Sequence, residues 1–277
     1  MTNPVFNNSA VFGEKANRDV QRTQAQQMHT GASMATDAAQ LDHMYNAPAA
    51  TTADTGRMTY DDVIMKTGFL FVLLVVTAAV TWNVAPGLYF IGAIVGLVLG
   101  LINAFKKQPS PPLIIAYTIA QGVFLGGLSF AFENMVVNGQ PLTGIVMQAV
   151  LATLSVFAVS LFLFKSGKVR VTPKFTRIVL IGMAGYLVFT LLNAILVWTG
   201  VLDGWGMRGG ALGIGIGILA VILAAMSLVM DFDAASTGVK NGIPKKYAWS
   251  AAFGLMVTLI WLYIELLRLI AILRGSE

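Results

Sequence analysis

Three ionisable residues in the last third of the chain could do chemistry in an apolar environment. Asp231 lies where one hydrophobic run ends, and Glu265 and Arg268 lie within the next run. A charged side chain in hydrocarbon costs at least about 2.5 kcal/mol on insertion scales, so it usually faces a bundle interior or a water path. Asp231 and Glu265 are therefore the leading candidates for pH-sensing or ion-gating residues.

Two buried carboxyl groups offer a specific chemistry. Burial in a low-dielectric medium disfavours the ionised form of a carboxyl group, and a second carboxylate nearby disfavours it further. Two such groups can share one proton and titrate as a pair. Loss of that proton would bring like charges together, which is a force able to separate two helices. Asp231 and Glu265 could also bind a hard cation such as Ca²⁺, although two ligands alone make a weak metal site.

A purely structural interpretation explains the same residues differently. Asp231 and Asp233 could end a helix at the lipid headgroups, and Glu265 could pair with Arg268 one turn further on. Depth is a second consideration, because Asp231 ends its run whereas Glu265 lies about 17 residues into its own. The two acids meet only if the seventh helix begins outside the membrane, at residues 245–249.

The elements that must position these residues are transmembrane helices. Of the 277 residues, 56% are hydrophobic and only 11% are charged, which indicates an integral membrane protein. With no cysteine, the chain has no disulfide and no Cys-ligated metal centre. Seven apolar runs each approach the roughly 20 residues that a helix needs to cross the hydrocarbon core. The runs span residues 67–84, 88–105, 113–132, 143–164, 178–200, 209–230 and 248–272. The predicted fold class is all-α, a polytopic domain of seven transmembrane helices over residues 61–277.

The segment before the first run has a different character. Residues 1–60 are rich in Asn, Gln, Ala, Thr and Asp without a sustained apolar period, which predicts a disordered tail. Basic residues gather in the loops after the second, fourth and sixth runs, and the alternate loops contain only Arg208. Because basic loops mark the cytoplasmic side, we expect a multi-pass protein of the inner (plasma) membrane with its N-terminus in the cytoplasm and its C-terminus outside. The lipid bilayer is the expected partner of these loops, and nucleic acid is not.

Glycines recur at four-residue spacing in three of the runs. This spacing places each set on one helix face, where the missing side chains allow close helix packing. The glycines concerned are Gly92, Gly96, Gly100, Gly122, Gly126, Gly209, Gly213 and Gly217.

Four segments, by their order along the chain and their context, resemble the Bax inhibitor family in its bacterial YccA-like branch. In chain order they are Ala116–Gly126, Lys165–Phe175, Leu228–Phe232 and Trp261–Leu269, and the resemblance covers about residues 60–275. It implies six helices around a central seventh, and a pH-sensitive Ca²⁺ leak with an acidic pair on the sixth and seventh helices. By motif, Asp231 matches the first acid and Glu265 the second.

The chain departs from the leak-type pattern at three places. The second acid, typically Asp, is Glu265. The third-span position that is often Glu is Gln121, which can form hydrogen bonds but cannot titrate. Leak-type members use an Arg in the second span as a latch to the acidic pair, and residues 88–105 contain none. If this chain has a latch, the latch uses another donor.

We therefore expect a pH-sensitive cation (Ca²⁺) leak protein gated by protonation of Asp231 and Glu265. The expected supporting residues are Asp233, Arg268 and Gln121. Cations and protons are the expected ligands. Ca²⁺ would bind transiently rather than as a resident cofactor. The family suggests that the deprotonated or latch-broken pair permits leak.

The alternative function is a non-conducting regulator or scaffold that binds other membrane proteins through its glycine-lined helices or its tail. Proton-coupled transport also stays open, although no inverted repeat is visible. An enzyme is not expected, because the seventh run lacks a lysine for a Schiff base and both histidines lie in the tail.

Overall fold

The computed structural model describes residues 56–137, 139–167 and 171–275, and only the backbone of Gln140. The long helices are α4 (Tyr60–Val84), α5 (Tyr89–Phe105), α6 (Pro111–Glu133), α7 (Ile145–Lys165), α8 (Pro173–Trp198), α9 (Gly210–Lys240) and α10 (Ala248–Gly275). Short 3-10 helices lie at η1 (Pro86–Leu88), η2 (Gly206–Arg208) and η3 (Lys245–Tyr247), and a two-stranded antiparallel hairpin pairs β1 (Val136–Val137) with β2 (Gln140–Pro141).

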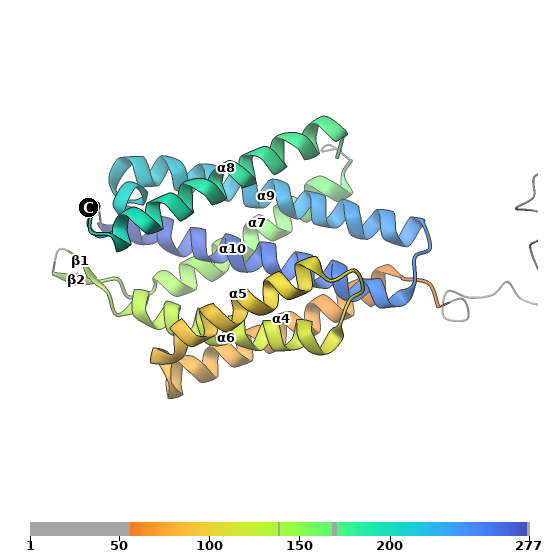
Figure 1. The fold of residues 1–277 in the computed structure, drawn as a ribbon, viewed down its shortest axis with the longest axis horizontal. Coiled ribbons are helices and arrows are strands. Elements are labelled where there is room, and N and C mark those ends of the chain that lie inside the picture. Colours follow the sequence, from red (N-terminus) through yellow and green to blue (C-terminus); the bar gives the residue numbers. More distant parts are fainter. Residues whose placement is uncertain (1–55, 138, 168–170, 276–277) are drawn as a thin grey trace, which may run out of the picture. The chain divides into compact units, whose positions relative to one another are not determined.

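Seven helices in the described part of the chain are long and apolar enough to cross a membrane, which confirms the predicted all-α polytopic class. They run roughly parallel or antiparallel to one another (Figure 1). The largest difference from the predicted boundaries concerns the sixth span, which continues as α9 to Lys240 instead of ending at residue 230. The interpretation of Asp231 and Asp233 as helix-ending residues is therefore wrong, since the helix runs on for two more turns. Apolar content alone set the predicted end, and a helix can continue through polar residues beyond the hydrocarbon core.

Local sequence signals explain where the helices begin. The Thr59 hydroxyl accepts a hydrogen bond from the Asp62 backbone N–H, and the Asp62 carboxylate accepts one from the Thr59 N–H, so the two form a capping box at the start of α4. The Thr172 hydroxyl caps α8 by accepting a hydrogen bond from the Phe175 N–H, and Pro173 occupies the first turn. Proline suits this position because a backbone N–H in the first turn would have no intrahelical partner, so its absence costs nothing.

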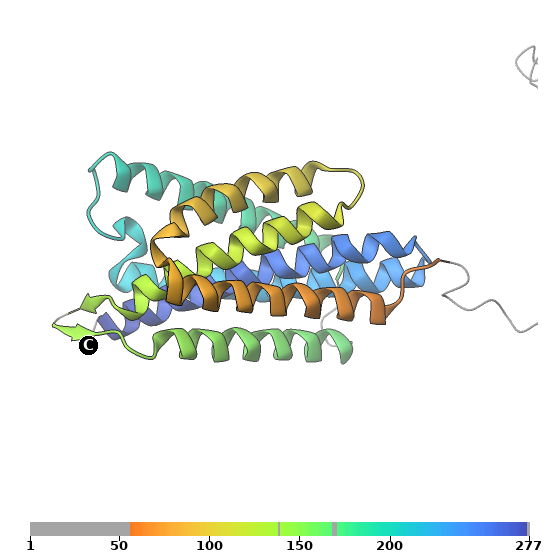
Figure 2. The same ribbon diagram turned by 90° about the horizontal axis from the view of Figure 1, so that it is seen from below.

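The seventh span, α10, is the most enclosed of the seven, with 78% of its apolar window buried. It packs against α4, α6, α7 and α9. By contrast, α5 packs mainly against α6, and α8 packs against α9 and η2. In Figure 2, α5 and α8 lie along one margin of the bundle, outside the layer that contains α10. An arrangement of six helices all around a central seventh is therefore not confirmed.

Close packing involves several of the glycines that recur every four residues. A Cβ atom added at Gly92 of α5 would lie 2.6 Å from the Phe124 backbone N of α6, and one at Gly126 of α6 would lie 2.3 Å from the Ala78 carbonyl O of α4. These positions have no room for a side chain. Gly213 is equally close to the Arg208 carbonyl, whereas Gly209 precedes α9 and belongs to its N-cap rather than to a helix face.

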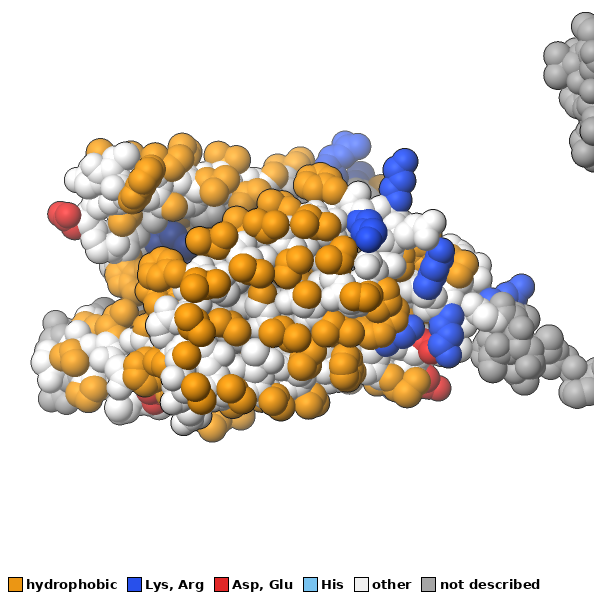
Figure 3. Space-filling view, turned by 60° about the horizontal axis from the view of Figure 1, so that its bottom comes forward, with side chains coloured by type: hydrophobic (Ala, Val, Ile, Leu, Met, Phe, Trp, Pro, Cys, Tyr) orange, Lys and Arg blue, Asp and Glu red, His pale blue; other side chains and the backbone are white. Residues whose placement is uncertain are grey.

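The two ends of the bundle differ in charge. Lysines gather where α5, α7 and α9 end, and we call this the basic end (Figure 3). Residues 56–60 of the predicted tail lie here and are held by the connection between α9 and α10: the Met58 N–H donates to the Ile243 carbonyl (2.8 Å), and the Lys245 N–H donates to the Gly56 carbonyl (2.8 Å). The remainder of the predicted tail, residues 1–55, lies outside the described residues.

Candidate functional site

Glu265 lies at the centre of a buried charged cluster. The residue is 3% exposed, and both oxygens of its carboxylate accept hydrogen bonds. Oε1 accepts from Arg208 Nη2 at 2.7 Å and from the Tyr186 hydroxyl. Oε2 accepts from Arg268 Nη2 at 2.7 Å and from Arg268 Nε at 3.3 Å. We call Tyr186, Arg208, Glu265 and Arg268 the Glu265 cluster.

The Glu265 cluster joins separate elements of the fold. Tyr186 comes from α8, Arg208 from η2, and Glu265 with Arg268 from one turn of α10. A further bond runs from Arg268 Nη1 to the Arg208 carbonyl at 3.0 Å, so the connection before α9 is held to α10 twice. Gly217 of α9 makes space for this arrangement, because an added Cβ would lie 3.4 Å from Arg268 Nη2.

The charges of this cluster do not cancel. One carboxylate faces two guanidinium groups, which leaves a formal surplus of one positive charge. Arg268 is 2% exposed, whereas the Arg208 side chain is 21% exposed and retains contact with the surroundings. An ion pair withdrawn from water is stable only when the remaining donors and acceptors are satisfied. The Arg208 Nε is buried and has no hydrogen-bond partner among the described residues.

Asp231 has a much simpler environment on the same interface. It lies on α9 at a partly buried position, and its Oδ2 accepts a hydrogen bond from the Thr258 hydroxyl of α10 at 2.7 Å. Gly254, one turn before Thr258, leaves room for the carboxylate, because an added Cβ would lie 3.5 Å from Oδ1. Thr258 itself is 8% exposed. Within the described part of the chain, Asp231 is thus an acid in a helix interface with a single neutral donor.

The structure does not bring Asp231 and Glu265 into one pair. Thr258 and Glu265 are seven residues apart on α10, so the levels of the two acids differ by about 10 Å along the helix axis. Each acid also has its own hydrogen-bond partners. What the structure does bring together is Glu265 with Arg268, the ion pair of the structural interpretation.

Of the three predicted supporting residues, Arg268 is bonded to Glu265, and the other two lie elsewhere on α9 and α6. Asp233 is partly buried on α9, two residues beyond Asp231, and therefore points to a different side of the helix. Gln121 lies on α6 against Gly96, and its buried carbonyl oxygen has no hydrogen-bond partner among the described residues. Within the described part of the chain, no group of three or more His, Cys, Asp or Glu residues could hold a metal ion.

Three residues of these two sites were not predicted from the sequence. Arg208 carried a signal, because it is the only basic residue of the connections at its end of the helices. Tyr186 and Thr258 gave no such indication, since Tyr or Thr residues occur in most of the apolar runs and the sequence does not show which of them face another helix. Their partners become visible only when the helices are placed side by side.

These observations define the class of protein to which the chain belongs. Seven apolar helices with charged and polar groups buried between them make the chain a multi-pass α-helical membrane protein. The family described as Bax inhibitor 1 like matches residues 3–275, nearly the whole chain, and the protein belongs to that family. It is in general a family of non-enzymatic membrane proteins. A comparison with curated proteins found no match.

Proposed function

We propose that this protein is a pH-sensitive cation (Ca²⁺) leak of the YccA-like branch whose gate lies along the interface of α9 and α10. The observation that carries the proposal is that the two acids have different hydrogen-bond partners. Glu265 is held by two arginines, whereas Asp231 has Thr258 as its one hydrogen-bond partner among the described residues. One acid is therefore suited to a latch, and the other to binding protons and cations.

The latch is the bond between Glu265 and Arg208. Arg208 precedes α9, so this bond and the one from Arg268 to the Arg208 carbonyl hold the start of α9 against α10. Arg208 supplies the donor that residues 88–105 do not contain. When the latch opens, the start of α9 is free to move from α10 and to admit ions from that end.

Asp231 is the proton-sensitive element. In its ionised form the carboxylate attracts a cation that moves along the interface, and in its protonated form it does not. Deprotonation increases as the pH rises, so the leak increases with pH through the titration of this one acid. A single carboxylate and a hydroxyl hold Ca²⁺ weakly, which is what a leak requires, because the ion must also depart.

The first experiment tests Asp231 with the full-length protein in liposomes that contain a Ca²⁺-sensitive dye. We expect Ca²⁺ entry to increase with pH for the unmodified protein and to be low and independent of pH for Asp231→Asn. Asp233→Asn is the matched control, because it removes a carboxylate two residues away and should retain the pH profile. If Asp231→Asn keeps both the rate and the profile, the proposed role of Asp231 is wrong.

The second experiment tests the latch. Arg208→Gln removes the charge that reaches Glu265 from η2, and we expect the leak to rise several-fold while its pH dependence persists. Arg274→Gln is the control, because Arg274 lies in the last turn of α10 and its Nη1 donates to the Thr143 carbonyl (2.8 Å) rather than to Glu265. An unchanged rate in Arg208→Gln, or an equal rise in both variants, would contradict the latch.

A further inference from the structure

A long apolar crevice runs between α4 and α7 on the side of the bundle away from α8. It consists of two adjoining cavities, of about 510 Å³ and about 780 Å³, which share Phe71, Leu154 and Leu259 in their walls. Each of the two bordering helices packs against α10, but α4 otherwise packs mainly on α6, and α7 on α9. We call this space the α4–α7 crevice.

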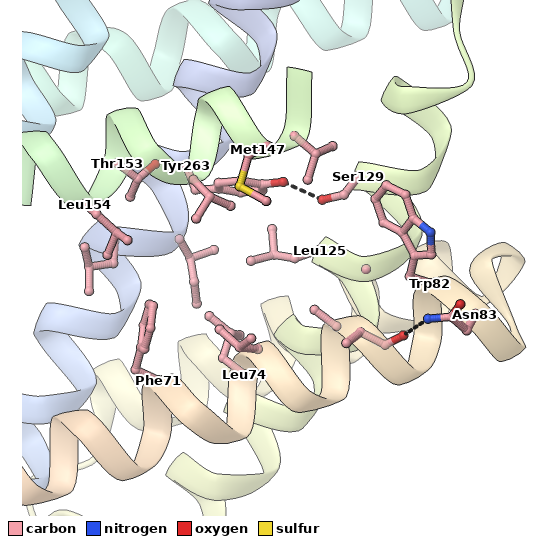
Figure 4. A pocket seen from close by; sticks show the side chains of 18 residues that line it. Phe71, Leu74, Trp82, Asn83, Leu125, Ser129, Met147, Thr153, Leu154 and Tyr263 are labelled. Carbon is pink, nitrogen blue, oxygen red and sulfur yellow. Dashed lines mark hydrogen bonds between the residues drawn. The ribbon is translucent and has the colours of Figure 1, made fainter. Parts of the chain in front are cut away.

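The walls of the crevice are suited to hydrocarbon. Figure 4 shows the smaller cavity, where Phe71 and Leu74 of α4 face Met147 and Leu154 of α7 across the open space. The Ser129 and Tyr263 hydroxyls at its edge are bonded to each other at 2.6 Å, so they offer little to a polar ligand. Both volumes fall in the range of small-molecule sites. An occupant of this space must be mainly apolar.

The length of the crevice also points to a lipid. Lining residues on α4 run from Tyr60 to Asn83, a rise of about 35 Å, which is close to the thickness of a bilayer's hydrocarbon core. An acyl chain that enters from one leaflet would therefore lie along the crevice in its ordinary direction. It would need no change of orientation to bind.

Charge distinguishes one end of the crevice from the other. Lys165, the last residue of α7, lines the larger cavity at the basic end. A lysine at a helix end extends its ammonium group to the headgroup layer while its stem covers apolar surface. None of the described residues that line the smaller cavity is a cation. An anionic headgroup is thus favoured at the basic end alone.

A second polar group lies in the same cavity. Thr67 of α4 lines it, and the Thr67 hydroxyl is buried without a hydrogen-bond partner among the described residues. Thr77 and Thr153, in contrast, donate to the carbonyl four residues earlier. A buried hydroxyl without a partner is destabilising. Thr67 lies about 10 Å along α4 from Tyr60, away from the basic end. After rotation of the Thr67 side chain, its hydroxyl can donate a hydrogen bond to an ester oxygen of a lipid at this level.

We propose that the α4–α7 crevice binds an acyl chain of an anionic phospholipid from the leaflet at the basic end, with the phosphate at Lys165. This binding is independent of the proposed leak. A lipid in this position fills the space between two helices that pack on α10, and therefore supports the bundle beside the α9–α10 interface.

Native mass spectrometry of the delipidated full-length protein can test the site with phosphatidylglycerol and phosphatidylcholine of identical acyl chains. We expect tighter retention of phosphatidylglycerol, and roughly fivefold weaker retention in Lys165→Gln, the effect of one lysine near an anionic surface. Lys107→Gln is the control, because Lys107 lies in another loop at the same end. Equal losses in both variants would overturn the headgroup assignment.

The apolar part of the site has its own matched pair. Leu154→Trp places a large ring where the two cavities join and should weaken retention of both lipids, whereas Leu151→Trp, on the 58% exposed neighbouring position of α7, should not. A phosphatidylglycerol with a photoreactive acyl chain should cross-link to α4 and α7. Cross-links confined to other helices, or equal behaviour of the two Trp variants, would exclude the crevice and leave a partner helix as its occupant.

Discussion

The Glu265 cluster and the Asp231 site lie at levels about 10 Å apart along the axis of α10, and they stabilise an acid in opposite ways. At Glu265, two guanidinium groups and a phenol contact the carboxylate. At Asp231, one threonine hydroxyl does. A carboxylate with two cationic partners is a fixed structural element, because moving it breaks several charged bonds together. A carboxylate with one neutral partner can gain or lose a proton without disturbing its neighbours, and the following predictions test this contrast.

The largest expected effect is the removal of Arg268 from the Glu265 cluster. Arg268→Met leaves Glu265 balanced by Arg208 alone, and it removes the Arg268 hydrogen bonds to Glu265 Oε2 and to the Arg208 carbonyl. A hydrogen bond to a charged group contributes about 1.5–3 kcal/mol, so the loss of several together is large. We expect a large fall in the apparent melting temperature, measured by fluorescence-detected size exclusion in detergent.

A matched double variant separates a lost ion pair from lost packing. Replacing both partners of an ion pair by apolar residues of similar size is often close to neutral when no other charge is left unpaired. Glu265→Met combined with Arg268→Met leaves the Arg208 guanidinium without its carboxylate, so it should be less stable than Arg268→Met alone. A double variant as stable as Arg268→Met, or more stable, would show that packing, and not the balance of charge, accounts for the loss.

A smaller effect is expected at the Asp231 site. Thr258→Val retains the shape of the side chain and removes the donor to Asp231, and a buried acceptor left without its partner costs about 1–3 kcal/mol. The ionised carboxylate needs this donor more than the neutral acid does. The loss of stability should therefore be greater at high pH, where Asp231 is ionised, than at low pH.

Thr258→Ser serves as the control for this prediction, because it retains the hydroxyl and should behave like the unmodified protein at every pH. A loss of stability in Thr258→Val that does not change with pH would show that packing, rather than the charge of Asp231, accounts for it.

The seven helices could be predicted from the sequence, and both acids could be singled out as candidate site residues. Both steps depend on properties of single segments, namely apolar content and the rarity of acids in hydrocarbon. The sequence did not predict which groups the acids contact. That depends on the register of α9 against α10, and the sixth helix was expected to end at residue 230, ten residues before Lys240. Pairing of Asp231 with Glu265 was inferred from a motif, whereas the register places Thr258 opposite Asp231.

The smallest effect is expected for Tyr186→Phe, which tests whether the phenol matters to a cluster that already contains two arginines. The substitution removes the hydroxyl bonds to Glu265 and Arg208, and it retains the ring that packs 5.7 Å from Trp261. Because the carboxylate keeps both guanidinium groups, we expect a loss of only about 0.5–1.5 kcal/mol in stability. Tyr186→Leu is the comparison, since it removes the ring as well and should be less stable than Tyr186→Phe. If Tyr186→Phe destabilises the protein as much as Arg268→Met does, then hydrogen bonding by the phenol, and not the balance of charge, maintains Glu265 in the bundle.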